Sequence, residues 1–521
     1  MPELSRNTQG ALEGARPVPA QALVARLSAF GHAGYLLAGM LLLVPISAEA
    51  KTLYVNGSTG NDSTSYAANG PSTPWRTIGR AAWGSTNREA RNASEAARAG
   101  DTVLVAAGTY AVAGTNSRNE PAYYTENTGT PGNPITFLAE GTVNLTLSSA
   151  RGSVIGAYRR DYIIWDGFTI NEATAPSHSD TGPVTIWFCT GCVLQNLDIN
   201  GNGDDNGRLD NHTGIRIEQS KNILIRNNRI QNVYTAHNVN NGAGVQVYSS
   251  GGVVFEHNEI FNCGSGIFLK GGPPTNNDYF TIRFNLIYNI GELERGTPAG
   301  NGVILHAGAP NRPEAPVRVY QNVIRNIREA GVKIWLFDGK DPTNNPMHVK
   351  IVNNTIDNCL YGLEVTHDPL PNSGHLFWNN VVTNTSDSAI AYGGSTSTLV
   401  KSRLDSEHNL FFSHGVFATA GGNHTFGSWK STFRQDSASP ASQNRSPQYA
   451  NPAGQDYRLQ PGSPARNAGV DVLDLDNDGS TSDPIHLGAY ITGNEVIGRT
   501  TGAPSQPTRG DGLPPLPPHI R

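Results

Sequence analysis

The chain has 521 residues, of which 58 are glycine and 16% are charged, and its formal net charge is −5 at pH 7. A domain that binds nucleic acid normally carries a basic excess, so the composition gives no indication of that function. The length would accommodate several ordinary domains, but a continuous repeat allows one domain to occupy most of it.

The N-terminal region has the features of a secretory signal. Residues 35–48 form the only long apolar stretch, and Ala48-Glu49-Ala50 follows with small residues at the expected cleavage positions. A membrane anchor is the alternative, but Pro45 and the short length of the stretch disfavour a spanning helix. We therefore expect residues 1–50 to be a signal peptide, and the mature protein to be secreted with no other membrane segment.

Residues 51–110 are predicted to cap the N-terminal end of the domain that follows. Residues 52–55 and 100–105 have strand patterns, and the Ala- and Arg-rich segment 75–99 is predicted to be broadly helical. A helix over the open end of stacked strands would cover their unpaired edges.

A repeat dominates the middle of the chain. An asparagine recurs at intervals of 32, 30, 27, 37, 32, 26 and 29 residues, nearly always with an apolar residue two positions later; its members are Asn196, Asn228, Asn258, Asn285, Asn322, Asn354, Asn380 and Asn409. Such a period is typical of solenoids, whose units bury their apolar faces only by stacking. We expect these asparagines to form tight corners and to hydrogen-bond from coil to coil.

Several motifs accompany this repeat. They are Trp75-Arg76-Thr77-Ile78, Ala99-Gly100-Asp101-Thr102-Val103, Gly108-Thr109-Tyr110 and Asn133-Pro134-Ile135-Thr136-Phe137. Together with the repeat they resemble the right-handed parallel β-helix proteins, particularly exported polysaccharide lyases, over roughly residues 52–490. The resemblance implies an all-β, right-handed parallel β-helix solenoid with an N-terminal helical cap. The solenoid is expected at 111–440, C-terminal rungs and a cap at 441–490, and a disordered tail at 491–521.

Each repeat also contains a glycine-led strand with aliphatic second and fourth residues. The fifth residue of each strand is predicted to point outward, and in a parallel stack these side chains would lie about 4.8 Å apart. The resulting line reads Trp187, Glu218, Tyr248, Lys270, His306, Trp335 and Thr366. A polysaccharide groove needs such a mixture, because aromatic faces bind sugar rings and titratable groups move protons.

Eliminative cleavage of a uronate polymer needs a base that removes the proton alpha to the carboxylate, and cations that neutralise the developing charge. Lys270 is the predicted base, with Tyr248 or His306 as the acid. Partial burial, or the charge of Arg283 or His306, would help Lys270 to lose its proton near neutral pH. The predicted substrate-binding residues are Trp187, Arg216, Glu218, Arg283, Lys333 and Trp335. Ordinary solvated side chains on a strand face are the alternative interpretation.

Two acidic segments are candidate calcium sites. The oxygen-rich loop 200–213 contains Asp204, Asp205 and Asp210, and related lyases often use calcium to hold the substrate carboxylate. The cluster Asp474, Asp476 and Asp478 resembles the start of an EF-hand loop, although Ile485 stands where that loop requires Glu. Simple polar turns are the alternative in both places, and calcium is the candidate cofactor.

The four cysteines carry little functional signal. Cys263 and Cys359 occupy equivalent repeat positions three coils apart and are predicted to be small buried residues. Cys189 and Cys192 are close enough in sequence to form a local bridge, but they lack the context of a redox or zinc site.

The leading hypothesis is a secreted, monomeric lyase that acts by β-elimination on an acidic polysaccharide. Two alternatives stay open: a glycoside hydrolase or epimerase with the same fold, and a non-enzymatic carbohydrate-binding or surface protein. Hydrolysis would need two carboxylates about 5 Å apart for retention or about 6.5–9.5 Å apart for inversion. On the outward columns the sequence offers only Glu218 and Glu364, which we place about five coils apart.

Overall fold

The computed structural model describes residues 49–176, 181–201, 211–235, 241–270, 280–291, 300–306, 316–335, 347–366, 374–393, 397–437 and 445–500. Almost all of the predicted signal peptide, the acidic loop residues Asp204, Asp205 and Asp210, and residues 501–521 lie outside this part of the chain.

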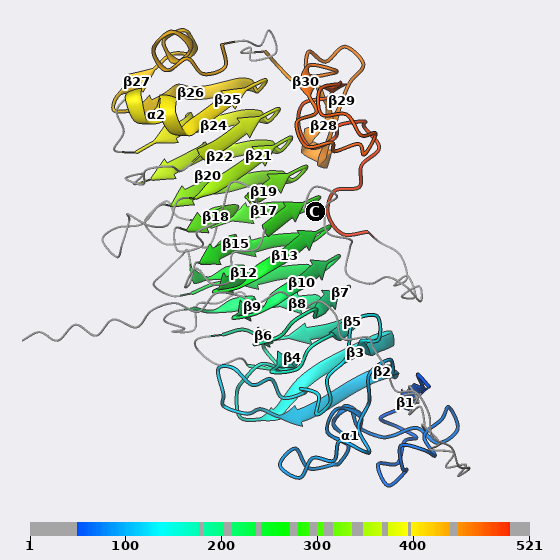
Figure 1. The fold of residues 1–521 in the computed structure, drawn as a ribbon. Coiled ribbons are helices and arrows are strands. Elements are labelled where there is room, and N and C mark those ends of the chain that lie inside the picture. The colour runs from blue at the N-terminus through cyan, green and yellow to red at the C-terminus, as the bar shows by residue number, and fades with distance from the viewer. Residues whose placement is uncertain are drawn as a thin grey trace, which may run out of the picture. The chain divides into compact units, whose positions relative to one another are not determined.

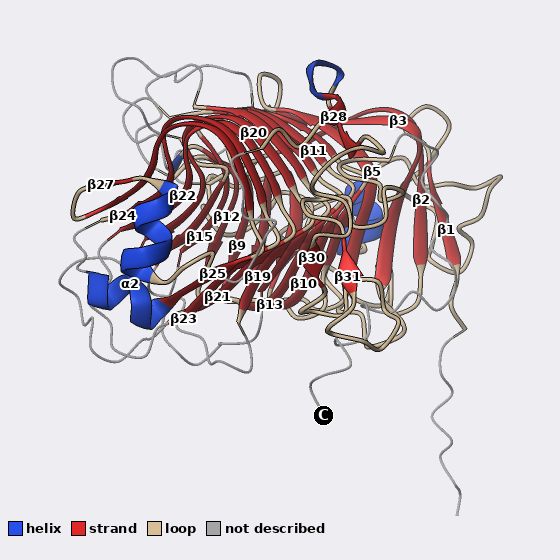
Figure 2. Cartoon of the chain, turned by 90° about the horizontal axis from the view of Figure 1, so that it is seen from above, coloured by secondary structure: helices blue, strands red, loops and turns tan. Residues whose placement is uncertain are grey.

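Most of the described strands form a parallel β-solenoid (Figure 1). One coil consists of β10 (Lys221–Arg226), β11 (Arg229–Val233) and β12 (Ala243–Tyr248). Each of these strands pairs in parallel with its equivalent in the next coil, namely β13 (Gly251–Glu256), β14 (Glu259–Cys263) and β15 (Ser265–Lys270). Seen from above, strands of successive coils lie one behind another (Figure 2). In the described residues, 27 strands belong to this one sheet.

The three strands of each coil define three faces, which we call A, B and C. Face A contains β4 (Ile155–Tyr158), β6 (Val184–Trp187), β9 (Thr213–Glu218), β12, β15, β18 (Val303–His306) and the second halves of β20 (Val323–Trp335), β22 (Thr355–Thr366), β24 (Val381–Tyr392) and β26 (Leu410–Ala420). Face B contains β7 (Val193–Gln195), β10, β13, β16 (Phe280–Arg283), β19 (Val317–Tyr320), β21 (His348–Val352), β23 (Gly374–Trp378) and β25 (Leu404–Glu407). Face C contains β8 (Asp198–Asn200), β11, β14, β17 (Leu286–Ile290) and the first halves of β20, β22, β24 and β26. Within the longer β5 (Ile163–Asn171), the first part pairs with β7 and the second with β8.

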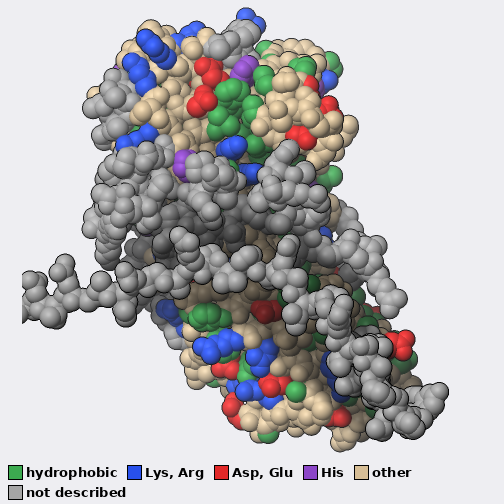
Figure 3. All heavy atoms as spheres, viewed as in Figure 1, with side chains coloured by type: hydrophobic (Ala, Val, Ile, Leu, Met, Phe, Trp, Pro, Cys, Tyr) green, Lys and Arg blue, Asp and Glu red, His purple; other side chains and the backbone are tan. Residues whose placement is uncertain are grey.

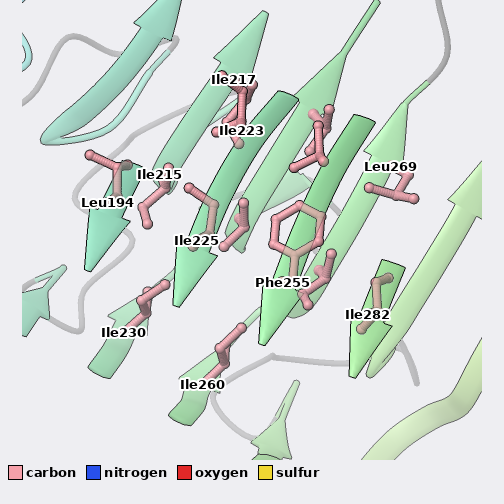
Figure 4. Packing of buried hydrophobic residues seen from close by; sticks show 14 of the residues in the cluster. Leu194, Ile215, Ile217, Ile223, Ile225, Ile230, Phe255, Ile260, Leu269 and Ile282 are labelled. Carbon is pink, nitrogen blue, oxygen red and sulfur yellow. The ribbon is translucent and has the colours of Figure 1, made fainter. Parts of the chain in front are cut away.

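The interior is filled by the alternating aliphatic residues of all three faces. Val245 and Val247 of β12 are buried, as the strand period of two predicts. Figure 4 shows Ile215, Ile225 and Phe255 pointing into the same interior. Burial of each such side chain stabilises the fold by about 1.5–3 kcal/mol, so the stacked coils share one continuous core.

A ladder of buried asparagine side chains lines the corner between faces B and C. From Asn228 to Asn409, each Nδ2 donates to the Oδ1 of the next member at 2.9–3.2 Å. The last donor, Asn409 Nδ2, lies 3.1 Å from Oδ1 of the buried Asp436. The amide dipoles are therefore aligned, and a carboxylate accepts at their positive end.

The prediction that Asn196 belongs to this ladder is wrong by one position. The backbone N–H of Leu197 donates to Asn228 Oδ1 at 2.9 Å, so Leu197 occupies the ladder position in its coil. Asn196 has a left-handed backbone with φ 56°, like Asn227 with φ 54° in the next coil. The sequence indicates that Asn196 is different, because Asp198 stands two positions after it, where the members of the ladder have an apolar residue.

The glycine that leads each face A strand and the apolar residue that follows each ladder asparagine pack against each other. A Cβ at Gly302 would lie 2.5 Å from Ile324 Cγ2 and 2.5 Å from the carbonyl oxygen of Gly331. A Cβ at Gly214 would likewise lie 2.6 Å from Ile230 Cγ2. The two repeated sequence features are therefore halves of one contact, in which glycine is needed for close approach.

The N-terminal region differs from the helical cap predicted over residues 75–99. The helix α1 comprises only Ile78–Trp83, and Gly84, with φ 71°, ends it. A Cβ on Gly84 would fall 1.9 Å from the carbonyl oxygen of Asn92, so the chain turns back sharply there. The strands predicted at 52–55 and 100–105 are confirmed: β1 (Thr52–Val55) pairs with β2 (Thr102–Ala113), which pairs with β3 (Ile135–Ser149), so this region also joins the sheet of the solenoid.

At the other end, short helical segments cover the core. They are α2 (Ser397–Arg403), α3 (Phe426–Ser428) and a π-helical turn (Trp429–Phe433), and Trp429 and Phe433 are buried in the main core. Strand β27 (Asn423–His424) pairs antiparallel with β26. None of the helices in the described part of the chain is long and apolar enough to span a membrane.

Residues 445–500 do not add the rungs expected at 441–490. They form two small antiparallel sheets, β28 (Tyr449–Asn451) with β29 (Asp456–Leu459) and β30 (Gly469–Val470) with β31 (Pro484–Ile485), together with a 3-10 turn (Pro452–Gly454). This region packs on the asparagine corner: Asn379 Nδ2 donates to the Val470 carbonyl at 2.7 Å. Further along, the Thr500 N–H donates to Asn227 Oδ1 at 2.7 Å, so the first ten residues of the predicted disordered tail follow the corner.

The cysteine predictions are confirmed for the buried pair. Cys263 and Cys359 are buried and unpaired with each other, and burial raises the pKa of the Cys263 thiol to about 12. Cys189 and Cys192 form a disulfide that closes the turn between β6 and β7.

Candidate active site

The predicted line of outward side chains is present on face A. Adjacent-coil register pairs Trp187 with Glu218, Glu218 with Tyr248, and Tyr248 with Lys270. It also pairs His306 with Trp335 and Trp335 with Thr366. A second outward column runs beside it through Thr185, Arg216, Gln246, Phe268, Ile304, Lys333 and Glu364.

Lys270 lies in a partly buried site between two loop amides and two aromatic rings. Its Nζ donates to Asn211 Oδ1 at 3.2 Å and to Asn241 Oδ1. The same atom is 4.7 Å from the ring centroid of Phe268 and 5.1 Å from that of Tyr248. Burial, and then the charge of Arg216, lower the pKa of Lys270 from the ordinary 10.5 to about 8.

Burial therefore lowers the pKa of Lys270 as expected. The neighbouring charge that lowers it further comes from Arg216 rather than from Arg283 or His306. Arg283 belongs to β16 on face B, where its Nε is 2.9 Å from Glu256 Oε2 and its Nη1 is 3.1 Å from the Tyr320 hydroxyl. The same outward alternation therefore places Arg283 on a different face from Lys270, away from the predicted line on face A.

Tyr248 shares the amide of Asn211 with Lys270. Its hydroxyl lies 3.0 Å from Asn211 Oδ1 and 3.2 Å from Gln246 Oε1, so it can donate to either amide. Burial raises the pKa of Tyr248 to about 12. The phenol consequently keeps its proton at neutral pH, next to an amine whose proton is unusually labile.

Arg216 and Glu218 are buried and bound to each other. Arg216 Nε is 2.9 Å from Glu218 Oε1, and Nη2 contacts the same oxygen. The guanidinium also lies 4.3 Å from the ring centroid of Tyr248, and its Nη1 has no hydrogen-bond partner among the described residues. Glu218, predicted to bind substrate, thus holds Arg216, which is itself fixed against the Tyr248 ring.

Arg118 approaches this site from outside the repeat. Its guanidinium is 5.3 Å from the ring centroid of Trp187 and 3.9 Å from Glu218 Oε2. Trp187 is only 6% exposed, so Arg118 stands where the sequence predicted an aromatic surface. Nothing in the repeat could have identified Arg118, because it belongs to the connection between β2 and β3.

A buried carboxylate and a buried imidazole hold one of the loop ends that form the site. His212 Nε2 is 2.7 Å from Glu172 Oε2, its Nδ1 is 2.9 Å from the carbonyl oxygen of Tyr234, and both side chains are fully buried. The neighbouring residue, Asn211, contacts both Lys270 and Tyr248. The pair thereby anchors the end of the long loop that supplies Asn211. The sequence signal for these residues was only the unusual length of this loop.

His306 and Trp335 continue face A after Lys270. Their rings meet edge to face with centroids 4.9 Å apart, and the His306 ring lies 6.2 Å from that of Phe268. His306 is thus placed among aromatic rings. Tyr248, the other predicted acid, shares the hydrogen-bond partner Asn211 with Lys270.

Lys333 belongs to an ionic cluster that sequence reasoning missed. Its Nζ is 3.1 Å from Glu364 Oε2 and also contacts Glu329, whose Oε2 accepts from Asn301 Nδ2 at 2.8 Å. Burial lowers the pKa of Lys333, but the two carboxylates outweigh it and the pKa is raised. The repeat pattern did not identify Glu329, because this residue precedes Gly331, in the bend of β20 and outside the glycine-led strand.

The predicted acidic residues near the C-terminus lie in one loop. Carboxylate oxygens of Asp471, Asp474 and Asp476 are within 4.8 Å of one another, as are those of Asp476, Asp478 and Asp483. Hard oxygen donors in this number suit calcium, whereas zinc would be expected to have Cys or His ligands. The candidate metal residues Asp204, Asp205 and Asp210 lie outside the described residues.

Comparisons with known proteins agree on the fold. A family model described as "Right handed beta helix region" matches residues 143–272, 185–347 and 239–425, which together span more than half of the chain. No curated protein matches the sequence.

Solved structures with a similar fold include pectate lyase Pel9A, which is 17% identical with a TM-score of 0.53 and aligns over 85% of this chain and 96% of its own. Another is the complex of XylC with xylose, 13% identical, with a TM-score of 0.38 over 70% and 84% of the two chains. A third is an alginate lyase from Paenibacillus sp. str. FPU-7, 14% identical, with a TM-score of 0.35 over 72% and 99%. At 17% identity the likeness to pectate lyase Pel9A concerns the fold alone. From the family match and the stacked parallel coils, the chain belongs to the right-handed β-helix family.

Proposed function

We propose that the protein is a secreted lyase that cleaves an acidic, uronate-containing polysaccharide by β-elimination. The observation that carries this proposal is the pairing on face A of Lys270, whose pKa is lowered to about 8, with the protonated Tyr248. A base with a pKa near the working pH combines a useful neutral fraction with enough proton affinity.

In the proposed reaction, neutral Lys270 takes the proton from the carbon next to the uronate carboxylate. The electron pair of that C–H bond becomes the new carbon–carbon double bond, and the glycosidic C–O bond at the adjacent carbon breaks. Tyr248 gives its proton to the departing oxygen, so that one chain ends in an unsaturated uronate and the other in a hydroxyl group. Asn211, which contacts both side chains, would hold the two groups at a fixed separation.

The developing negative charge on the carboxylate would be stabilised by nearby guanidinium groups. Arg216 offers Nη1, which is buried and has no partner among the described residues. Arg118, with a side chain 44% exposed, lies beside the same carboxylate of Glu218 and is accessible to substrate. Fixed donors in a site with little water stabilise such charge more strongly than solvent does.

Calcium is part of the proposal as a structural ion at the C-terminal loop. Asp476 belongs to both groups of neighbouring carboxylates, so its side chain would be central to binding. We expect calcium to raise the melting temperature of the protein and to have less effect on Asp476→Asn. Equal calcium responses of the two proteins would remove this site from the proposal.

Export is supported by two separate features of the chain. The apolar stretch 35–48 ends in small residues, and the Cys189–Cys192 disulfide is a bond that persists in oxidising compartments. Expression of the full sequence, followed by N-terminal sequencing of any protein released into the medium, would check this point.

Glu329 and Glu364 favour one second candidate, a glycoside hydrolase. Both carboxylates contact Lys333 Nζ, so they lie together rather than about five coils apart as expected for Glu218 and Glu364. The ammonium between them would have to be displaced before one could act as acid and the other as base. Elimination is therefore the better-supported reaction.

The decisive experiment is an assay of purified protein on pectate, alginate and glycosaminoglycans, with and without EDTA. Elimination gives an ultraviolet-absorbing unsaturated uronate, whereas hydrolysis gives new reducing ends without that absorbance. We expect absorbance to appear and to be lost in Lys270→Ala and Tyr248→Phe, but retained in the matched face B variant Arg283→Gln. Reducing ends without absorbance, lost in Glu364→Gln, would replace the lyase by the hydrolase.

A further inference from the structure

A groove on face B lies away from Lys270 and has no part in the proposed reaction. It has a volume of about 350 Å³ and lies between β21, β23, β25 and α2. Its charged and titratable lining residues are His348, Lys350, His375, Lys401, Arg403 and Asp405. This volume falls within the range of about 300–1,000 Å³ that is common for sites that hold small ligands.

Positive charge accumulates at this groove although the whole chain is acidic. Lys350 lies beside Arg318 of the preceding coil in register, and burial, followed by the charge of Arg318, lowers the pKa of Lys350. Within the described part of the chain, neither Lys350 nor Lys401 has an acidic partner. Figure 3 shows Lys and Arg side chains near the end of the molecule where Figure 1 places α2. Asp405 supplies the one opposing carboxylate of the lining.

His375 belongs to the inner wall of the groove. It is 3% exposed and pairs in register with Val349 and Leu404 of the core, whereas Lys350 and Asp405 occupy the alternate, outward positions. Burial and the nearby charges of His348 and Arg403 lower the pKa of His375 to about 3, so the imidazole is neutral at pH 7. The positive charge of the groove therefore comes from its lysines and its arginine.

We propose that the face B groove binds an oxyanion, with Lys350, Lys401 and Arg403 supplying charge. The lysines repel each other and are repelled by Arg318, so an anion placed among them stabilises their charged forms. The anionic group is a carboxylate, sulfate or phosphate, and it belongs either to a polysaccharide or to a free small molecule.

The test is isothermal titration calorimetry with three probes: inorganic phosphate, sodium sulfate and an oligogalacturonate. The oligogalacturonate is titrated into Lys270→Ala protein, so that turnover does not obscure binding. Binding of phosphate or sulfate without the oligosaccharide identifies a site for free oxyanions, and binding of the oligosaccharide identifies a second polysaccharide site. If none of the three probes binds, the proposal is overturned.

Variants connect the binding to the groove. Removal of one charge-assisted contact weakens binding by about tenfold or more, so we expect at least this rise in Kd for the double variant Lys350→Gln, Lys401→Gln. The matched variant Lys430→Gln, an exposed lysine on the π-helical turn, should leave Kd unchanged. Equal affinities of the double variant and the unmodified protein would refute the site.

Discussion

The pKa of Lys270 makes the proposed reaction testable by its pH dependence. With a pKa of about 8, about one lysine in eleven is neutral at pH 7, whereas at the ordinary 10.5 about one in three thousand would be. The environment of Lys270 thus raises the neutral base at pH 7 by about 300-fold. We expect kcat/KM to rise with pH and to level off above about pH 8.

Arg216→Gln perturbs this environment without touching the amine. It removes the like charge that lowers the pKa of Lys270, and it leaves the Glu218 carboxylate with only the more distant Arg118, so that the carboxylate attracts the ammonium more strongly. Both effects raise the pKa, so the rising limb of the profile should move to higher pH. Burial is the larger cause and is retained, so the limb should stay below 10.5. A limb that moves up by one pH unit lowers kcat/KM at pH 7 by about tenfold.

The assay is the initial rate of product absorbance on the substrate found above, measured for both proteins from about pH 6 to about pH 11. Arg283→Gln is the matched control, because it breaks an Arg–Glu pair of the same kind on face B. A limb that stays at the same pH in Arg216→Gln, or that moves equally in Arg283→Gln, would refute the assignment of Lys270 as the base tuned by Arg216.

Three further changes test the frame of the site. Gly302→Ala should lower the free energy of unfolding by about 1–3 kcal/mol, because its Cβ would overlap Ile324, whereas Gly70→Ala, which meets no atom closer than 3.7 Å, should change it little. Asn285→Ala should lower the free energy of unfolding by about 2 kcal/mol or more, since two donors of Asn258 lose their acceptor. A loss no larger than that of Asn196→Ala, a residue outside the ladder, would contradict the corrected register. Both are measured by urea denaturation. Glu172→Ala should reduce kcat about tenfold or more with a smaller change in KM, because the loop that carries Asn211 loses its anchor, and Glu172→Gln, which keeps an acceptor, should restore most of the rate.

Much of the solenoid could be predicted because its repeats obey local rules. A corner asparagine, an apolar residue two positions later and a leading glycine recur together since all three meet in one contact, as Gly302 with Ile324 shows. Where one rule failed, at Asp198 after Asn196, the assignment failed with it. The helix predicted over residues 75–99 was too long, because composition favoured a helix while the close approach of Gly84 to Asn92 ended it.

The candidate site could be predicted only in part. Alternation placed Tyr248, Lys270 and His306 on one line, since a strand period of two fixes which face each side chain takes. It could not supply Arg118, Asn211 or Glu329, which come from connections and a bend whose positions do not follow the repeat.

The sequence by itself determined the coil, its register and the outward line of side chains, because these depend on interactions between residues at regular spacing. Only the tertiary structure decided which of those side chains are paired. Arg216 is held by Glu218, Lys333 by Glu329 and Glu364, and Arg283 lies on another face, while Lys270 is left among amides and aromatic rings that lower its pKa. Burial and charge pairing depend on distances between chain segments that are remote in sequence, and these distances set the protonation of the proposed base.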